Sequence, residues 1–236
     1  MKFFILGDSW GLGEWKIINK IMTLVPDTGL DYYLHNAGHI TTNASVGCAS
    51  NFGQLRNAYW RLKENSNYDY IIWFHTEPVR DIIETVLDDN IDGPIQYPNF
   101  KNIKDYNEAI TYVNECNYNY AQKMFEEFDI PFIVIGGVGR LEDSIDNYAF
   151  AKHKIYSWTA EILNLDYKLP RNIYSRHDFD RIFSITSYNK NQLLEEIDLA
   201  LQYRTLLVDS PLFPDNAHVI RNEYEKLAHR LLKLIN

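Results

Sequence analysis

The sequence contains little cysteine and no long apolar run. Its only cysteines, Cys48 and Cys116, exclude a disulfide framework and a cysteine-rich zinc site. No stretch approaches the roughly eighteen consecutive apolar residues of a membrane-spanning helix. The apolar run at residues 2–6 meets Gly7-Asp8 and is too short for the core of a signal peptide. We therefore expect a cytoplasmic or otherwise non-secreted protein with no membrane span.

Positive charge is also scarce. The chain has 23 Lys and Arg residues against 32 Asp and Glu residues, a formal net charge of −9. Proteins that bind nucleic-acid phosphates or an anionic membrane surface need a basic face, so neither partner is expected. The glycine patterns that bind nucleotides are absent from the sequence, and the scattered histidines show no metal-ligand spacing. We expect no metal and no organic cofactor.

Short apolar segments alternate with amphipathic ones along the chain. The predicted strands are residues 2–6, 39–46, 69–74, 130–135 and 154–158. The predicted helices are residues 15–25, 28–36, 51–64, 104–128, 193–207 and 219–235. Short strands with apolar residues at nearly every position are typical of a parallel sheet that is covered on both faces. The pattern predicts an α/β fold, a three-layer αβα sandwich with a mostly parallel sheet of about five strands.

Two polar segments interrupt this alternation, and we expect a single domain over residues 1–236 that contains both. Residues 88–104 contain glycine and proline and are too long for an ordinary connection, which predicts a lid or a substrate loop. Residues 166–180 are similarly irregular. Ligands of parallel sheets bind beyond the carboxyl ends of the strands, so the residues after each strand are the candidates for a site.

The first strand is followed by Gly7-Asp8-Ser9. A serine on a tight turn between a strand and a helix exposes its hydroxyl and directs nearby backbone N–H groups toward the atom that it attacks. Asp8 or Ser9 could instead cap the following helix. Gly7-x-Ser9-x-Gly11 also matches the nucleophile turn of α/β-hydrolases, but that fold has several strands before its nucleophile and is excluded.

Asp215 and His218 lie three residues apart before the last predicted helix. A carboxylate can fix the tautomer of an imidazole, and the imidazole can then accept a proton from a serine. Such a pair also arises by chance, and Asp215 could be the N-cap of the helix. The two ends of an α/β chain can meet at one edge of the sheet, where Ser9, Asp215 and His218 would form a triad.

Together these motifs resemble the SGNH (GDSL-type) hydrolase family, which has a Gly-Asp-Ser nucleophile motif near its N-terminus and a D-x-x-H motif near its C-terminus. Residues 43–47, Asn-Ala-Ser-Val-Gly, look like the second block of the family. The resemblance spans the chain and implies that Ser9 is the nucleophile, His218 the base and Asp215 its orienting acid. It also implies that the backbone amides of Ser9 and Gly47 form an oxyanion hole.

The third block departs from the family pattern. The family has Gly-x-Asn-Asp after its third strand, whereas this chain has His75-Thr76-Glu77-Pro78. Glu77 stands where an asparagine donor is expected, and an ionised carboxylate has no proton to donate. Burial could keep Glu77 protonated; Thr76, His75 or Arg80 could donate instead; or the hole could be incomplete. Glu77 could also be an ion-pair partner of Arg80.

The resemblance implies an ester hydrolase. We expect it to act on a small-molecule or carbohydrate ester with a short acyl group such as O-acetyl, because the sequence shows no apolar surface helix suited to a lipid interface. Trp10, Asn51 and His75 adjoin the three blocks and are predicted to contact the substrate. Cys48 is predicted to be a small buried thiol rather than a nucleophile. The alternative is a weak or inactive binding module in which Glu77 marks a decayed oxyanion hole.

Overall fold

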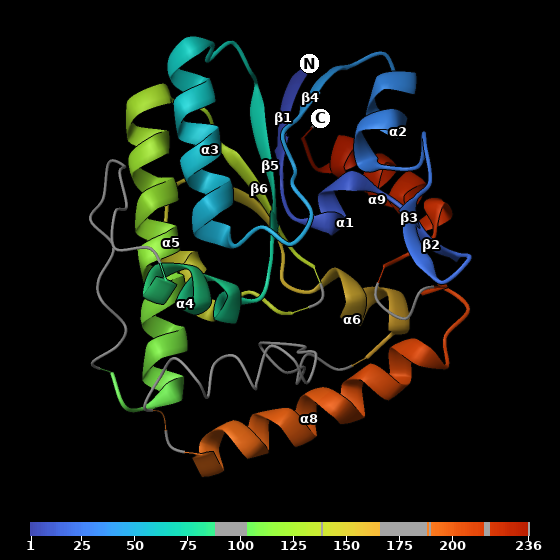
Figure 1. The fold of residues 1–236 in the computed structure, drawn as a ribbon. Helices are drawn as coiled ribbons and strands as arrows, with labels where there is room; N and C mark the ends of the chain where they lie inside the picture. The colour runs from blue at the N-terminus through green and yellow to red at the C-terminus, as the bar shows by residue number, and fades with distance from the viewer. Residues whose placement is uncertain (88–102, 138, 166–187, 189, 215–217, 236) are drawn as a thin grey trace.

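A computed structural model describes residues 1–87, 103–137, 139–165, 188, 190–214 and 218–235 (Figure 1). Most of the predicted insert at 88–104, the irregular segment at 166–180 and Asp215 lie outside the described residues. In the part of the chain that is described, no helix is both long and apolar enough to cross a bilayer.

The centre of the structure is a five-stranded sheet in which every pair of neighbouring strands is parallel. Its order is β4 (Ile40–Asn43), β1 (Lys2–Leu6), β5 (Tyr70–His75), β6 (Phe132–Gly136) and β7 (Ala151–Ile155). This sheet confirms the predicted parallel arrangement. The strand predicted at 154–158 exists but lies earlier in the chain, because Ser157 accepts the Ala160 amide and caps a helix that begins at Trp158.

Helices cover both faces of the sheet and confirm the predicted three layers (Figure 1). One face carries α3 (Asn51–Glu64), α4 (Pro78–Leu87) and α5 (Tyr106–Phe128). The other carries α1 (Ser9–Leu12), α2 (Leu30–Asn36), α6 (Trp158–Leu163) and α9 (Arg221–Ile235). A short 3-10 helix, η2 (Asp143–Asn147), precedes β7, and α8 (Lys190–Val208) lies across the bottom of the view.

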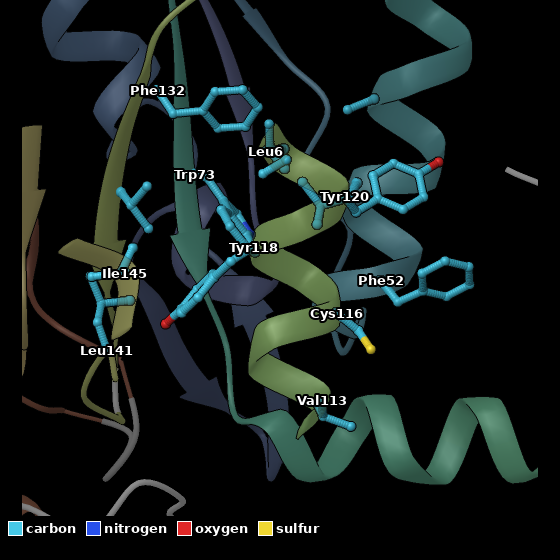
Figure 2. Close-up of a cluster of buried hydrophobic side chains, with 14 of the residues drawn as sticks. Leu6, Phe52, Trp73, Val113, Cys116, Tyr118, Tyr120, Phe132, Leu141 and Ile145 are labelled. Atoms are coloured by element: carbon cyan, nitrogen blue, oxygen red, sulfur yellow. The ribbon is translucent and has the colours of Figure 1, made fainter. Parts of the chain in front are cut away.

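The strands are apolar at nearly every position because both of their faces are buried. Along β1, Phe4 and Leu6 pack toward α3 and α5, whereas Phe3 and Ile5 pack toward α2 and α9. Figure 2 shows the first of these two clusters, with side chains of the sheet against those of α5. Because successive side chains of a strand point to opposite faces, the sheet has one hydrophobic core on each of its two faces.

Residues 15–25 form a β-hairpin, and the prediction of a helix there was wrong. The hairpin consists of β2 (Trp15–Ile18) and β3 (Ile21–Leu24), paired antiparallel. Asn19 and Lys20 join them with φ of 51° and 66°, the left-handed pair of a two-residue hairpin turn. Apolar spacing in so short a run fits either structure, and the β-branched residues here favour the strand.

The hairpin exposes apolar side chains that a helix was expected to bury. Ile17, Ile18, Ile21 and Met22 have exposed fractions of 57%, 50%, 68% and 51%. The base of the hairpin differs from this tip, because Trp15 is only partly exposed and lies near the start of α1. The tip of the hairpin therefore presents an apolar surface to solvent.

Two further expectations need correction. The helix α4 was not predicted, although Pro78 is well suited to the first turn of a helix, where its missing N–H is not needed. Cys48 was predicted to be buried but is exposed. It lies in the turn between β4 and α3 with φ of 64°.

The close packing between the end of β6 and the residues after β7 can be tested at Gly136. A Cβ on this glycine would lie 2.2 Å from the backbone oxygen of Tyr156 and 3.0 Å from that of Gly139. We expect Gly136→Ala to lower the free energy of unfolding by about 1–3 kcal/mol, measured by urea denaturation. Gly47→Ala is the control, since a Cβ there meets nothing within 4 Å, and a similar loss in both variants would contradict this packing.

Candidate active site

Ser9 is the first residue of α1 and follows β1 after a two-residue turn. The turn packs closely on its surroundings at two glycines. A Cβ on Gly7 would lie 2.8 Å from Cβ of Phe74 in β5, and a Cβ on Gly11 would lie 2.1 Å from Ser45 Oγ. The serine is therefore held at the carboxyl edge of the sheet, against the third strand and the segment that follows β4.

The structure brings Ser9 and His218 together. His218 Nε2 lies 2.6 Å from Ser9 Oγ, although the two residues are 209 positions apart in the chain. The imidazole is 5% exposed, and its ring centre lies 5.5 Å from that of Trp15 and 6.3 Å from that of Trp10. A base within hydrogen-bonding reach of a serine hydroxyl is the arrangement that activates a serine nucleophile.

Hydrogen bonds between the two ends of the chain hold this pair together. The Tyr224 hydroxyl of α9 donates to the backbone oxygen of Trp10 at 2.9 Å. The Arg221 amide donates to Glu14 Oε2 at 2.7 Å. Burial raises the pKa of Glu14, but hydrogen bonds from Lys16 and the Arg221 amide outweigh it and leave that pKa below its usual value. Glu14 is therefore ionised at neutral pH and anchors the start of α9 beside α1.

Asp8 connects the turn that carries Ser9 to residues 76–80. It is 3% exposed, and its Oδ1 accepts the backbone N–H of Trp10 at 2.9 Å, so the interpretation of Asp8 as a helix cap is confirmed. Its Oδ2 accepts hydrogen bonds from Thr76 Oγ1 and Arg80 Nη1, both at 2.8 Å. One carboxylate thus orders the start of α1 and fixes it to the residues after β5.

Glu77 is buried and ionically paired. Its Oε2 lies 3.1 Å from Arg80 Nη2, which confirms the ion pair predicted from the sequence, and 2.6 Å from Thr76 Oγ1. Arg80 therefore spans the carboxylates of Asp8 and Glu77, and the Thr76 hydroxyl lies between the same two groups. The donors of Arg80 and Thr76 are directed at carboxylates within the protein.

The side chains predicted to contact the substrate are buried. His75 packs in the core between Trp73 and Tyr118, with ring centres 5.1 and 5.8 Å away, on the α5 side of the sheet. Burial lowers its pKa to about 3, so the imidazole is neutral at physiological pH. Trp10 is 3% exposed and packs on Trp158 with ring centres 5.6 Å apart.

Asn51 is fully buried and clamps the backbone of the third block. Its Oδ1 accepts the Thr76 amide at 2.8 Å, and its Nδ2 donates to the Thr76 carbonyl at 2.9 Å. Asn51, His75 and Trp10 therefore support the frame of the site with packing and hydrogen bonds. The sequence placed them correctly beside the three blocks but did not distinguish a supporting position from a contact with substrate.

Gly47 follows a segment that is fixed to the nucleophile turn. The Val46 amide donates to the Gly7 carbonyl at 2.9 Å, and Asn43 Nδ2 donates to the Gly11 carbonyl at 2.9 Å. No side chain or backbone atom lies within 4 Å of where a Cβ on Gly47 would be, so the space beside its backbone is open. Asp215 lies outside the described residues, and its place in a triad stays a prediction.

Several residues that build the site were not identified from the sequence. Tyr224 and Glu14 carry no motif, and only the fold shows that they join α9 to α1. The role of Asp8 was hidden inside the nucleophile motif, where it was considered only as a cap. Among the side chains that the structure describes, no group of three or more His, Cys, Asp or Glu residues could hold a metal ion.

No protein-family model and no curated protein matches the chain. Among solved structures, it is similar to the psychrotrophic esterase EstA from Pseudoalteromonas sp., at 12% identity and a TM-score of 0.48 over 99% of this chain and 96% of that one. It is also similar to a carbohydrate acetylesterase family member from Sinorhizobium meliloti, at 10% identity and a TM-score of 0.47 over 100% and 97% of the two chains. Likenesses of this size carry no argument about function, which rests on the geometry of the site.

The buried position of His75 can be tested by the pH dependence of stability. Because its folded pKa is about 3 and its usual value is 6.5, the folded protein prefers the neutral ring, and this contribution to stability is lost as pH falls below 6.5. Relative to His75→Gln, the wild type should lose about 3 kcal/mol of unfolding free energy between about pH 7.5 and 4.5. Urea denaturation of both proteins measures this difference; a constant difference would mean that the ring is solvated.

Proposed function

We propose that this protein is a serine hydrolase of carboxylic esters. The observation that carries the proposal is the 2.6 Å separation of Ser9 Oγ and His218 Nε2 at the carboxyl edge of a parallel sheet. Ligands of such sheets bind at this edge, so the pair lies where a substrate can reach it. The burial of His218 beside two tryptophan rings limits the positions that the imidazole can take.

The reaction proceeds in two halves. His218 accepts the hydroxyl proton of Ser9 as the serine oxygen attacks the ester carbonyl, and a tetrahedral oxyanion forms. The oxyanion collapses, the bond to the alcohol breaks, and His218 gives its proton to the departing alcohol. Water then attacks the acyl-serine with His218 as base, which releases the carboxylic acid and restores Ser9. In this scheme Asp215, from its place in the D-x-x-H motif, orients the imidazole.

The backbone amides of Ser9 and Gly47 stabilise the oxyanion in this proposal. Support comes from the hydrogen bonds of Val46 and Asn43, which hold the Gly47 segment against the turn that carries Ser9. Our proposal includes no third donor to the oxyanion, because Glu77 stands where the sequence pattern has an asparagine donor. Of the alternatives that the sequence left open, Thr76 and Arg80 are directed at carboxylates, and His75 lies on the opposite face of the sheet from α1. We therefore propose an oxyanion hole built from backbone amides.

The observations say less about the acyl group of the substrate than about the type of reaction. The expectation of a short acyl group, such as a carbohydrate O-acetyl ester, rested on the absence of an apolar surface suited to a lipid. The exposed tip of the β2–β3 hairpin removes that reason, because Ile17 and Ile21 are 57% and 68% exposed. We propose a carboxylic ester as substrate, with p-nitrophenyl acetate and the octanoate as the pair that tests acyl length.

Substitution of the nucleophile tests the reaction. We expect Ser9→Ala to lower the turnover of p-nitrophenyl acetate by at least about a thousandfold, because no other group in the scheme forms the acyl intermediate. Ser66→Ala is the matched control, since Ser66 is exposed in the loop between α3 and β5, and it should retain wild-type activity. Equal activity in wild type and Ser9→Ala would remove the assignment.

Labelling with a fluorophosphonate distinguishes the hydrolase from a binding module that has kept the fold. The buried carboxylate of Glu77 is the observation that favours this second function, because it adds negative charge near the nucleophile turn. We expect the probe to label wild type and Ser66→Ala but not Ser9→Ala, as read by intact mass. A folded wild-type protein that is not labelled would support the binding module.

Substitution of Glu77 tests the composition of the oxyanion hole. Glu77→Gln removes a negative charge and supplies an N–H donor of nearly the same shape, so we expect kcat for p-nitrophenyl acetate to rise about tenfold. Glu77→Ala removes the charge without adding a donor and should raise kcat less. A fall in kcat for Glu77→Gln, in a variant with wild-type thermal stability, would show that the glutamate itself assists the reaction.

A further inference from the structure

A second carboxylate, Asp81 of α4, is completely buried behind the third block. Its Oδ1 accepts the backbone N–H of Phe52 at 2.6 Å, and its Oδ2 accepts Nδ2 of Asn51 at 2.9 Å. Both donors belong to the first turn of α3. From α4, the Asp81 carboxylate therefore holds the start of α3, and it fixes the side chain of Asn51.

Asn51 passes this constraint to the site. Its amide group bonds to both the N–H and the carbonyl of Thr76, so the position of the Thr76 backbone follows that of Asn51. The Thr76 hydroxyl in turn bonds to Asp8, which caps the helix that begins at Ser9. Hydrogen bonds thus run without a break from Asp81 through Asn51, Thr76 and Asp8 to the nucleophile turn.

We propose that Asp81 is a positioning residue, whose ionised carboxylate acts through Asn51 to hold the Thr76–Glu77 turn and Asp8 in the geometry that presents Ser9 to His218. This inference rests on the proposed function for its catalytic consequence. The hydrogen bonds that carry it do not depend on the reaction.

The charge state of Asp81 decides whether the constraint holds. An ionised carboxylate accepts on both oxygens, as the amides of Phe52 and Asn51 require, whereas a protonated carboxyl has one oxygen that acts as a donor. Protonation therefore leaves one of the two N–H groups without a good acceptor in a buried place. The constraint is present above the pKa of Asp81 and is lost below it.

The groups around Asp81 place this transition near neutral pH. The pKa of Asp81 is raised to about 7. Burial is the largest cause of the rise and the charge of Glu84 on the same helix adds to it, whereas the hydrogen bonds from the Phe52 amide and Asn51 lower the pKa. From α5, the side chain of Asn117 also lowers the pKa of this carboxylate. The buried thiol of Cys116 faces it from the same helix, and its own raised pKa keeps it neutral.

The test compares wild type with Asp81→Asn across pH. Asparagine has nearly the same shape but cannot accept on both of its terminal atoms, so it mimics the protonated state. We expect the wild-type kcat to exceed that of Asp81→Asn by about tenfold or more at pH 8.5 and by less than about threefold at pH 5.5, with similar KM.

Asp69→Asn is the matched control. Asp69 also accepts a backbone N–H, that of Lys2 at 2.7 Å, but lies just before β5, at the opposite edge of the sheet from Ser9. The ratio of the wild-type kcat to that of Asp69→Asn should be close to one at both pH values. A ratio for Asp81→Asn that does not change with pH would overturn the proposal, because loss of packing alone has no such pH dependence.

A measurement without turnover separates this proposal from the proposed function. The Thr76 amide donates to Asn51, so its protection from hydrogen exchange in the wild type should fall about tenfold as pH drops from 8.5 to 5.5, measured as a protection factor by NMR. Constant protection of Thr76 would overturn the positioning role even if Asp81→Asn fails to fold. Loss of protection in a protein with no esterase activity would leave this inference standing and remove the esterase.

Discussion

The hydrogen bond between Ser9 and His218 exists only because the two ends of the chain are held at one edge of the sheet. A parallel sheet places the carboxyl ends of all its strands together, so the turn after β1 opens onto the same edge as those after β4 and β5. The start of α9 is then fixed beside α1 by bonds from Tyr224 and Arg221. Without these contacts the imidazole would have no defined distance from the serine.

Buried charge is the second feature that organises the site. Asp8 and Glu77 lie within the protein and share Arg80, which is 30% exposed at its side chain. Removing a carboxylate from water is costly unless it is paired and hydrogen-bonded, and Asp8 meets this requirement through the Trp10 amide, Thr76 and Arg80. These charges join two segments that are far apart in the sequence, residues 8–10 and 76–80. The stability of the buried charges and the geometry of the nucleophile turn therefore depend on the same bonds.

The β2–β3 hairpin shows how local spacing can mislead. Its apolar residues recur at intervals that suit one face of a helix, but the turn at Asn19 and Lys20 converts the segment to two strands. The consequence is chemical as well as geometric, since Ile17 and Met22 become exposed instead of buried. At the base of the same hairpin, Trp15 donates to the Ser9 carbonyl at 3.0 Å, so the hairpin that carries the apolar tip is hydrogen-bonded to the residue at the start of α1.

The sequence by itself determined the layers, the parallel sheet, the limits of α3 and the choice of Ser9 and His218, because apolar strands, helix caps and short motifs are local signals. It predicted a helix at residues 15–25, where the structure has a hairpin, and it predicted substrate contacts for Asn51 and His75, which are buried. It also did not identify Glu14, Tyr224 or Asp81 as parts of the frame. These depend on contacts between residues remote in the chain, and burial and pairing at such contacts are set by how the layers pack, which only the tertiary structure decides.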